Sequence, residues 1–329
     1  MKTVAFFNNK GGVGKTSLVY HLAWMFAHQG IRVLAVDLDP QANLTAMFLN
    51  EDQLNEIWNG QGANTVFHTL RPIIERSGPV ADPHVINIAP NVGLVAGNLA
   101  LSKFEDLLSE NWPKALESNV APFRVLTAFH DIIVRAAASM NASLILIDVG
   151  PNLGAINRAA MLAAQHVILP LAPDLFSLQG MKNLGPTLRE WRAGWKKRLG
   201  EAPKELSNLP LGEMAPSGYV VMQHSLRDAK PVKAYQRWID RIPASYRDAV
   251  LGEAVVQADI PTAEADPYRL ALLKNYRSLM PMAMDAHKPM FQLRSSDGAI
   301  GAHIEAVQAC FNDFDSLATK ISTAIALQR

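Results

Sequence analysis

Two lysines lie five residues apart in a glycine-rich run whose residue types suit the binding of phosphate. The run reads Asn8-Asn9-Lys10-Gly11-Gly12-Val13-Gly14-Lys15-Thr16-Ser17. In such a loop, backbone N–H groups wrap phosphate oxygens, a lysine binds the outer phosphates, and a hydroxyl ligates Mg²⁺. Lys15 and Thr16 have the types and places for the last two roles. Lys10 is one cation more than the loop requires.

The sequence on either side of this run predicts the elements that a phosphate-binding loop needs. Thr3 to Phe7 is rich in β-branched and aromatic residues, which is typical of a buried strand. Leu18 to Phe26 has the apolar periodicity of a helix. We therefore expect a strand, a loop and a helix whose N-terminus faces the anion. The alternative, a glycine-rich turn with two incidental lysines, does not explain this context.

Two aspartates follow the next predicted strand. Ile31 to Val36 is apolar and ends in Asp37-Leu38-Asp39-Pro40-Gln41. Alternation along a strand places Asp37 and Asp39 on the same side, at the carboxyl edge where open parallel sheets bind ligands. Carboxylates there can hold metal-bound water and position an attacking one. A strand end with a solvated turn is the alternative, because acidic residues and proline are common in turns.

A third aspartate ends another apolar strand. Leu144 to Ile147 is followed by Asp148, an arrangement that supports Mg²⁺ in phosphate-binding proteins. The predicted metal site therefore consists of Thr16, Asp39 and Asp148.

The loop departs from the ordinary pattern G-x-x-x-x-G-K-[ST], because Asn9 replaces the first glycine and Lys10 follows it. The form K-G-G-x-G-K-[ST] resembles the deviant Walker A loop of the ParA/MinD (Soj-like) ATPases. That resemblance implies that Lys10 reaches across a dimer to phosphates bound by the other subunit. It also implies that residues 37–41 form switch I, in which Asp39 orients or activates the hydrolytic water.

The segment after Asp148 is similar to switch II of the same family. Residues 149–154 read Val-Gly-Pro-Asn-Leu-Gly, and a helix-like stretch and an apolar strand follow. Relatives commonly have threonine and proline where this chain has Val149 and Gly150. We therefore expect hydrolysis to be slow or differently gated. The resemblance covers residues 1–49 and 143–185 with specific motifs, and the remainder only by the order of elements.

The resemblance implies an ATPase that binds ATP and Mg²⁺, forms a homodimer on ATP, and reopens on hydrolysis. Lys10, Lys15 and Asp39 are its expected catalytic residues. The expected base contact is Gln223, which occupies roughly the place of a base-contacting residue in relatives. The nucleotide-binding set is Lys10, Gly11, Gly12, Val13, Gly14, Lys15, Thr16, Ser17 and Gln223.

Length and composition predict one elaborated α/β domain. The chain has 329 residues, of which 49% are hydrophobic, enough for a large core. Strand and helix patterns alternate, which indicates a mostly parallel sheet with helices on both faces, as in P-loop NTPases. We expect a single domain over 1–329 with helical insertions near 50–84 and 200–275. The expected strands lie near 3–8, 31–37, 85–89, 92–96, 143–148, 166–170 and 217–223.

Cysteine content and hydropathy disfavour several classes of protein. The single cysteine, Cys310, can form no internal disulfide and cannot supply the paired cluster ligands of nitrogenase iron protein. We expect it to be a buried thiol. No apolar stretch approaches the roughly 18 residues that span a bilayer, and no signal peptide is recognisable. The helical pattern of Ala299 to Leu327 lacks a basic membrane-binding face. We therefore expect a cytoplasmic protein without a membrane partner.

The formal net charge of +1 gives no global attraction to DNA, so any binding needs a local patch. The helical stretch Leu184 to Leu199 has an apolar face and recurring cations on another. Such a stripe can neutralise phosphates without reading bases, which the resemblance also leads us to expect after dimerisation. A solvated amphipathic face explains the same residues. The candidate DNA contacts are Arg189, Arg192, Lys196, Lys197 and Arg198, and a rival patch comprises Arg227, Lys230, Lys233, Arg237 and Arg241.

Three functions remain open at this stage. The first is a ParA-type ATPase in DNA, plasmid or chromosome partition or cargo positioning, stimulated by a ParB-like partner. The second is a regulatory ATPase of a mobile-element or defence module, which uses residues 200–275 to bind a dedicated protein. The third is a ligase resembling dethiobiotin synthetase, which the D-x-D-P-Q segment disfavours.

Overall fold

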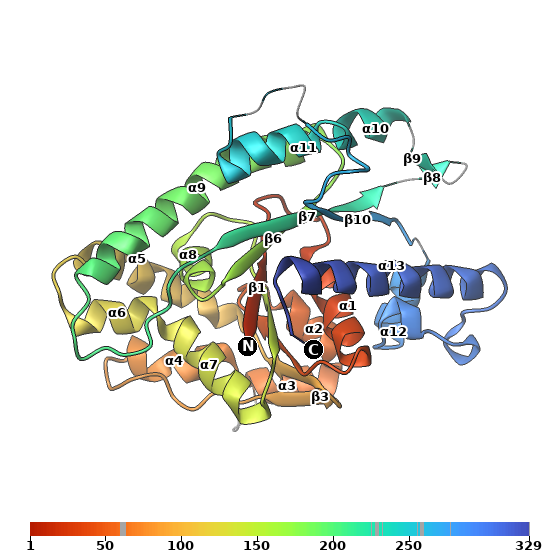
Figure 1. The fold of residues 1–329 in the computed structure, drawn as a ribbon. Helices are drawn as coiled ribbons and strands as arrows, with labels where there is room; N and C mark the ends of the chain where they lie inside the picture. The colour runs from red at the N-terminus through yellow and green to blue at the C-terminus, as the bar shows by residue number, and fades with distance from the viewer. Residues whose placement is uncertain are drawn as a thin grey trace.

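A central sheet collects strands from most of the chain (Figure 1). Its spatial order is β10-β7-β6-β1-β5-β2-β4-β3. All neighbouring pairs are parallel except β3 and β4, which are antiparallel. The strands are β1 (Lys2–Phe6), β2 (Val33–Asp37), β3 (Ile86–Ala89), β4 (Val92–Val95), β5 (Leu144–Asp148), β6 (His166–Leu171), β7 (Ala215–His224) and β10 (Arg269–Lys274).

The computed structural model describes residues 1–59, 64–224, 226–227, 230–231, 233–254, 256, 260–276 and 278–328. For residues 223–234 it does not describe the side chains. The first helices are α1 (Lys15–His28), α2 (Asn43–Phe48), α3 (Glu51–Asn59), α4 (Val66–Ile74), η1 (Leu99–Lys103), α5 (Phe104–Lys114), α6 (Val120–Leu126) and α7 (Ala128–Met140). The later ones are α8 (Ala155–Leu162), α9 (Leu175–Gly200), α10 (Lys233–Ile239), α11 (Ile242–Ser245), η2 (Tyr246–Leu251), α12 (Leu279–Asp285), η4 (Met290–Gln292), η5 (Ser295–Asp297) and α13 (Ala302–Ala324). A short hairpin pairs β8 (Leu226–Arg227) with β9 (Lys230–Pro231).

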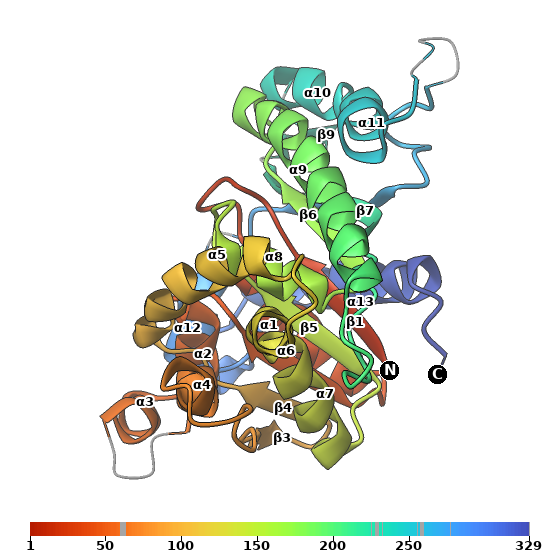
Figure 2. The same cartoon turned by 90° about the vertical axis from the view of Figure 1, so that its left-hand side faces the viewer.

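Helices cover both faces of the sheet (Figure 1, Figure 2). One buried cluster joins the sheet to α4 through α9, and the other joins it to α1, α2, α12 and α13. Strand alternation explains the division, since Ile145 and Ile147 of β5 enter the first cluster while Leu144 and Leu146 enter the second. Both faces are buried, so these strands are continuous apolar runs. The predicted α/β class is confirmed.

The expected strands all occur, with ends shifted by a few residues. The strand β10 was not predicted, because the apolar run 270–273 is equally compatible with a short helix. It pairs in parallel with β7. The range 200–275 is therefore not wholly an insertion, because β7 and β10 are integral strands of the main sheet. The range 50–84 contains the helices α3 and α4, and its assignment as an insertion stays a prediction.

The last helix, which the sequence pattern predicts near its observed place, packs on α1 and β10 (Figure 1). Cys310, Phe314 and Leu317 form its buried face. The thiol of Cys310 is fully buried, and burial raises its pKa. Among the described residues, none of the helices combines the length and the hydropathy needed to traverse a lipid bilayer.

Candidate nucleotide site

The loop between β1 and α1 has the backbone conformation of an anion cradle. Gly12 and Gly14 have φ angles of +73° and +89°, a region that favours glycine. No side chain caps the start of α1, and no acidic residue lies in its first turn. The free N–H groups of this turn therefore point to a place suited to phosphate.

Asn8 anchors the loop to the neighbouring strand. Its Nδ2 donates a hydrogen bond to the Pro170 carbonyl at 2.6 Å, and its Oδ1 accepts one from the Lys10 backbone N–H at 2.9 Å. Asn8 is buried. The phosphate-loop motif does not include this position, so the anchoring role of Asn8 was not predicted from the sequence.

A cavity of about 520 Å³ opens beside the loop. It brings together Lys15, Thr16 and Asp39, which the sequence placed in one site. Met280 and Met284 of α12 line it as well, and the sequence did not predict them. The full lining is Gly11, Gly12, Gly14, Lys15, Thr16, Ser17, Asp39, Gln41, Asn43, Ala46, Met47, Pro151, Met280 and Met284. Val13 is not in this lining, because its side chain is buried in the protein.

The ammonium group of Lys15 is desolvated, and its hydrogen bond to the protein is weak. The residue is 7% exposed, and within the described part of the chain Nζ donates one long hydrogen bond, of 3.4 Å, to the Lys10 carbonyl. Burial lowers the pKa of Lys15, whereas Asp148 and Asp39 act to raise it. A buried cation of this kind is suited to binding phosphate oxygens.

Asp37 has a structural role that the sequence did not predict. The carboxylate accepts hydrogen bonds from the backbone N–H and the hydroxyl of Thr45, at 2.8 and 2.7 Å. The Thr45 hydroxyl in turn accepts one from the Gly97 N–H. Burial raises the pKa of Asp37 to about 7. This residue joins β2 to α2, so it does not face the cleft with Asp39 as the alternation of the strand suggested.

Asp148 lies beside Asp37 in register and is fully buried. Among the described residues, neither of its oxygens has a hydrogen-bond partner of normal geometry. Burial and the neighbouring Asp37 raise its pKa, while the Thr16 hydroxyl and Lys15 oppose them. A buried carboxylate without partners is costly by itself and fits the water shell of a bound cation.

Asp39 lies at the wall of the cleft. Its backbone N–H donates to Asp37 Oδ1 at 3.3 Å, and its own Oδ1 accepts from the Gln41 N–H at 3.0 Å. A Cβ atom on Gly150 would stand 3.3 Å from Asp39 Oδ1. The segment 149–154, the expected switch II, therefore approaches the Asp39 carboxylate of the expected switch I at a glycine.

The residues present fit a Mg²⁺ ion that arrives with a nucleotide. No three or more His, Cys, Asp or Glu side chains are grouped to hold a metal in the part of the chain that the structure describes. Mg²⁺ typically keeps several waters and takes few protein ligands together with phosphate oxygens. Thr16 and Asp148 match that requirement better than they match a site made only of protein ligands.

Lys10 is held by residues of its own chain. Its Nζ forms an ion pair with the Asp174 carboxylate and lies 5.6 Å from the centre of the Phe176 ring. Asp174 also caps α9 by accepting from the Ser177 N–H at 2.9 Å. Burial acts to raise the pKa of Asp174, but the bonds from Lys10 and Ser177 leave it lowered. Sequence reasoning missed Asp174 and Phe176 as neighbours of this lysine.

A smaller cavity of about 150 Å³ adjoins the loop at Gly14 and Ser17. Met222, Tyr276 and Phe314 contribute apolar and aromatic surface to it, which suits a planar base. The side chain of Gln223 lies outside the described residues, so its predicted base contact stays a prediction.

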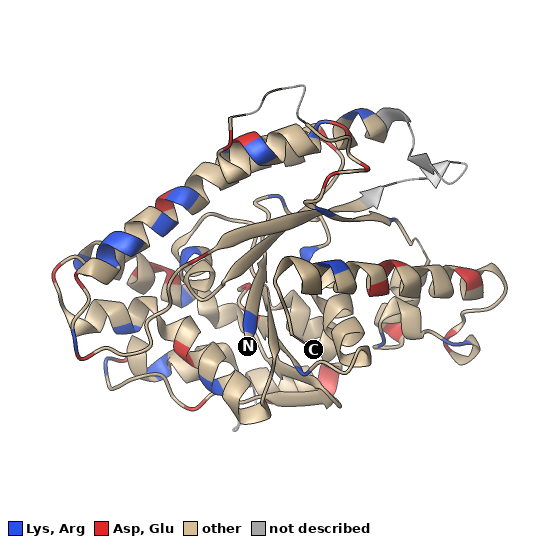
Figure 3. Cartoon of the chain, in the orientation of Figure 1, with Lys and Arg blue, Asp and Glu red and all other residues tan. Residues whose placement is uncertain are grey.

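Figure 3 marks the Lys and Arg positions along α9, the helix that carries the predicted DNA contacts. Two of the five predicted residues, Arg189 and Arg198, form hydrogen bonds inside the fold instead. Arg198 is 6% exposed, donates to the Trp112 and Gly194 carbonyls at 2.6 and 2.8 Å, and stacks on Trp112. The prediction that Arg198 contacts DNA is therefore wrong, because its guanidinium is used inside the fold.

Arg189 is also partly engaged, since it donates to the Ala249 and Val250 carbonyls at the end of η2. Arg192 is half-buried, and Lys196 and Lys197 are exposed. Of the rival patch, the side chains of Arg227, Lys230 and Lys233 lie outside the described residues.

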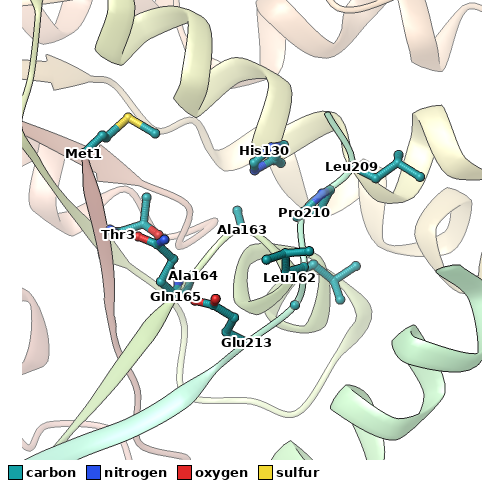
Figure 4. A pocket seen from close by; sticks show the side chains of 12 residues that line it. Met1, Thr3, His130, Leu162, Ala163, Ala164, Gln165, Leu209, Pro210 and Glu213 are labelled. Atoms are coloured by element: carbon teal, nitrogen blue, oxygen red, sulfur yellow. Dashed lines mark hydrogen bonds between the residues drawn. The ribbon is translucent and has the colours of Figure 1, made fainter. Parts of the chain in front are cut away.

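A separate cavity of about 180 Å³ lies at the amino ends of β1 and β6 (Figure 4). Thr3, Leu162 and Pro210 line it, and His130 of α7 borders it. Burial lowers the pKa of His130. This cavity is at the end of β1 opposite to the phosphate loop, so it takes no part in the site described above.

Comparison with known proteins matches residues 1–200 to a family model described as an AAA domain. The chain is 30% identical over 194 residues to Protein IncC of Escherichia coli, covering 58% of this chain and 47% of that protein. It is 30% identical over 204 residues to the chromosome-partitioning ATPase Soj of Thermus thermophilus, covering 60% and 66%. It is 28% identical over 199 residues to the chromosome partitioning protein ParA of Caulobacter vibrioides, again covering 60% and 66%. The matched part thus spans half to two thirds of the length of these curated relatives.

Several solved structures are similar over nearly the whole chain. Protein DIP2308 from Corynebacterium diphtheriae has a TM-score of 0.71 at 25% identity and covers 98% of both chains. An ATP complex of McdA from Cyanothece has a TM-score of 0.62 at 14% identity, with 100% of this chain and 98% of McdA covered. The second likeness concerns the fold alone.

Proposed function

Because the chain belongs to the ParA/MinD (Soj-like) family of deviant Walker A ATPases, we propose that it is an ATP-driven molecular switch of the ParA type. In this proposal two subunits dimerise around two nucleotides, and hydrolysis reopens the dimer. The observation that carries the proposal is the convergence of Lys15, Thr16 and Asp39 on one cleft beside the loop that bears Lys10.

The site residues divide the work of phosphoryl transfer to water. When bound, ATP and Mg²⁺ supply the reacting phosphate and part of its charge neutralisation. Lys15 would bind outer phosphate oxygens, Thr16 would ligate the metal, and Asp148 would hold water bound to the metal. Asp39 orients the attacking water by accepting a hydrogen bond from it.

Lys10 completes the site of the partner subunit in this proposal. To reach the partner, its ammonium group must leave Asp174 and Phe176, which hold it within its own subunit. Dimerisation therefore exchanges a contact within the subunit for one between subunits. Such an exchange makes the dimer depend on the triphosphate.

Hydrolysis is slow and partner-stimulated in this proposal. Val149 is buried and apolar, so switch II has no hydroxyl at that position. In this proposal a ParB-like or other protein partner increases the rate of ATP hydrolysis. We infer this partner from the partition functions in the names of the curated relatives.

The proposed biological role is partition or cargo positioning through non-specific DNA. Arg192, Lys196 and Lys197 of α9 provide the remaining basic face, which acts through phosphate contacts. In this proposal the protein is cytoplasmic, and its binding to DNA would associate it with the nucleoid.

A regulatory ATPase of a mobile-element or defence module is the second candidate. The observation that favours it is that the Arg189 and Arg198 guanidinium groups donate hydrogen bonds to backbone carbonyls within the fold. Few cations of α9 then remain to contact DNA. ATP-dependent retention on DNA of arbitrary sequence separates the two functions, because only the first requires it.

The test of the proposal is the replacement Lys10→Ala. We expect wild type to sediment as a dimer with ATP and Mg²⁺, and Lys10→Ala to remain a monomer that still binds nucleotide through Lys15. Lys320→Ala, which removes an exposed lysine of α13, is the matched control and should dimerise normally. Equal ATP-driven dimerisation by Lys10→Ala and wild type would refute the crossing lysine.

A further inference from the structure

Switch II is fixed to the protein by a side chain from inside the helix that follows it. Asn157 of α8 is 1% exposed, and its Nδ2 donates to the Gly150 and Asn152 carbonyls at 2.8 and 2.6 Å. Gly150 is the residue that approaches Asp39. The position of the loop therefore follows the position of the first turn of α8.

The first turn of α8 has no cap of its own. Its N-cap residue is Gly154, which has no side chain to accept a hydrogen bond. Uncapped N–H groups at a helix start need an acceptor when they are buried, and Ala155 and Ile156 are buried.

Glu105 of α5, far away in sequence, provides that acceptor. Its two carboxylate oxygens accept hydrogen bonds from the Ala155 and Ile156 N–H groups at 2.5 and 2.8 Å. A negative charge at this end of α8 also interacts favourably with the helix dipole. Figure 2 shows α5 beside α8.

Gly154 permits this contact. A Cβ atom added there would stand 2.6 Å from Glu105 Oε1 and 3.0 Å from Asn152 Oδ1. Both atoms are the ends of side chains, so an alanine at this position would displace Glu105 without striking the backbone. The chain thus offers two independent ways to break the same contact.

A second contact holds α5 and α8 together away from the loop. The Arg158 guanidinium of α8 stacks on the Trp112 ring of α5 at 4.1 Å, and Arg198 stacks on the same ring at 3.8 Å. Removal of the Glu105 carboxylate alone should therefore free the start of α8 while the two helices stay packed.

We propose that Glu105 is a positioning residue for ATP hydrolysis, which fixes switch II through the start of α8 and thereby places Gly150 against Asp39. Glu105 is not among the residues that line the nucleotide cavity, so in this proposal it acts only through the loop. The inference rests on the proposed role of Asp39 in orienting water. Small displacements of a water-orienting group can cost on the order of 100-fold in rate.

The experiment compares steady-state hydrolysis with nucleotide binding in Glu105→Ala, Glu105→Gln and Gly154→Ala. We expect Glu105→Ala to lower kcat by about ten-fold or more while the Kd for a fluorescent ATP analogue changes by less than about two-fold. Glu105→Gln, which retains an acceptor oxygen, should recover part of the rate. Asp106→Ala is the matched control, because it removes the other acidic residue of the first turn of α5, which is exposed.

The alanine at Gly154 tests whether the contact itself matters. Gly154→Ala should reproduce the lower kcat of Glu105→Ala, and the double variant should be no slower than either single one, since both remove the same interaction. Amide hydrogen exchange at Ala155 and Ile156 should increase in each variant.

Several results would overturn the inference. One is a kcat close to that of wild type in Glu105→Ala although exchange at Ala155 and Ile156 rises. Another is a parallel decrease of kcat, analogue binding and thermal stability, which would indicate a purely structural residue. Additive decreases of kcat in the double variant would also contradict it. Failure of the proposed function looks different, because wild type would then hydrolyse ATP no faster than Asp39→Ala.

Discussion

At the scale of single residues, the two lysines of the loop are in opposite situations. Lys15 is buried in the cleft, where the described residues offer it one long hydrogen bond, so its ammonium group is available to a ligand. Lys10 already has a carboxylate partner and a ring beside it. The sequence motif treats both as phosphate ligands, whereas the structure shows that only one is free to act without rearrangement.

The ion pair of Lys10 leads to a prediction about Asp174. Asp174→Asn removes the charge but keeps a good helix cap, so α9 should start normally while Lys10 is released. We expect half-maximal dimerisation at an ATP concentration up to about five-fold lower, because a partly exposed ion pair contributes up to about 1 kcal/mol. Sedimentation across an ATP titration measures it.

The control for this experiment is Asp52→Asn, which neutralises an exposed acid in the first turn of α3. Its dimerisation should match that of wild type. A requirement for more ATP in Asp174→Asn than in wild type would show that the ion pair does not restrain Lys10.

At the scale of elements, α9 links the nucleotide loop to the proposed DNA surface. Its N-cap residue Asp174 holds Lys10, and a Cβ on Gly180 would stand 2.6 Å from Asn9 Oδ1, so the helix lies directly against the loop. Farther along, Arg189 fastens the helix to η2. The cations available to DNA are in its later turns.

These later turns can be tested by charge reversal. Arg192→Glu, Lys196→Glu and Lys197→Glu together should weaken ATP-dependent retention on non-specific DNA without changing nucleotide binding. The slope of log K against log salt should fall by roughly 0.9 for each phosphate that the variant no longer neutralises. Filter retention at several salt concentrations measures both quantities.

The matched control reverses three exposed cations elsewhere, Lys103, Lys114 and Arg124. It changes the net charge equally and should leave retention nearly intact. Equal weakening by both triple variants would mean that α9 provides no specific surface.

At the scale of the whole molecule, His21 of α1 joins two segments that lie 269 residues apart in the sequence. It is fully buried, its Nδ1 lies 2.7 Å from the Ser17 carbonyl, and its Nε2 accepts a hydrogen bond from the Met290 N–H at 3.1 Å. This arrangement requires the neutral ring with its proton on Nδ1. Burial lowers the pKa of His21 to about 4.

A pH dependence of stability follows from this burial. Between the ordinary pKa near 6.5 and the folded value near 4, the unfolded state binds the proton and the folded state does not. Stability should therefore fall as pH decreases, by about 2 kcal/mol between pH 7 and pH 5 from His21 alone. Urea unfolding at both pH values measures it.

His21→Gln should flatten this pH dependence even if it lowers the overall stability. His84→Gln, which changes an exposed histidine, should leave it as in wild type. The same difference between pH 7 and pH 5 in His21→Gln and wild type would assign the effect to other groups.

The sequence alone was sufficient for the local parts of this protein. The phosphate loop, the aspartates at the strand ends and the seven expected strands depend on residue types and spacing within short segments. Backbone geometry and hydrophobic periodicity act over such distances, so they can be predicted without the rest of the fold. Among the strands of the main sheet, β10 was not predicted, because its apolar run is compatible with either a strand or a short helix.

The tertiary structure decided which of those groups are available. Asp37 accepts a hydrogen bond from Thr45, Lys10 forms an ion pair with Asp174, and Arg198 stacks on Trp112. Each partner is distant in sequence or lies in another element. The cap that Glu105 gives to α8 is of the same kind. Side-chain partners far apart in the chain are set by how the helices pack on the sheet, and no periodicity in the chain encodes that packing.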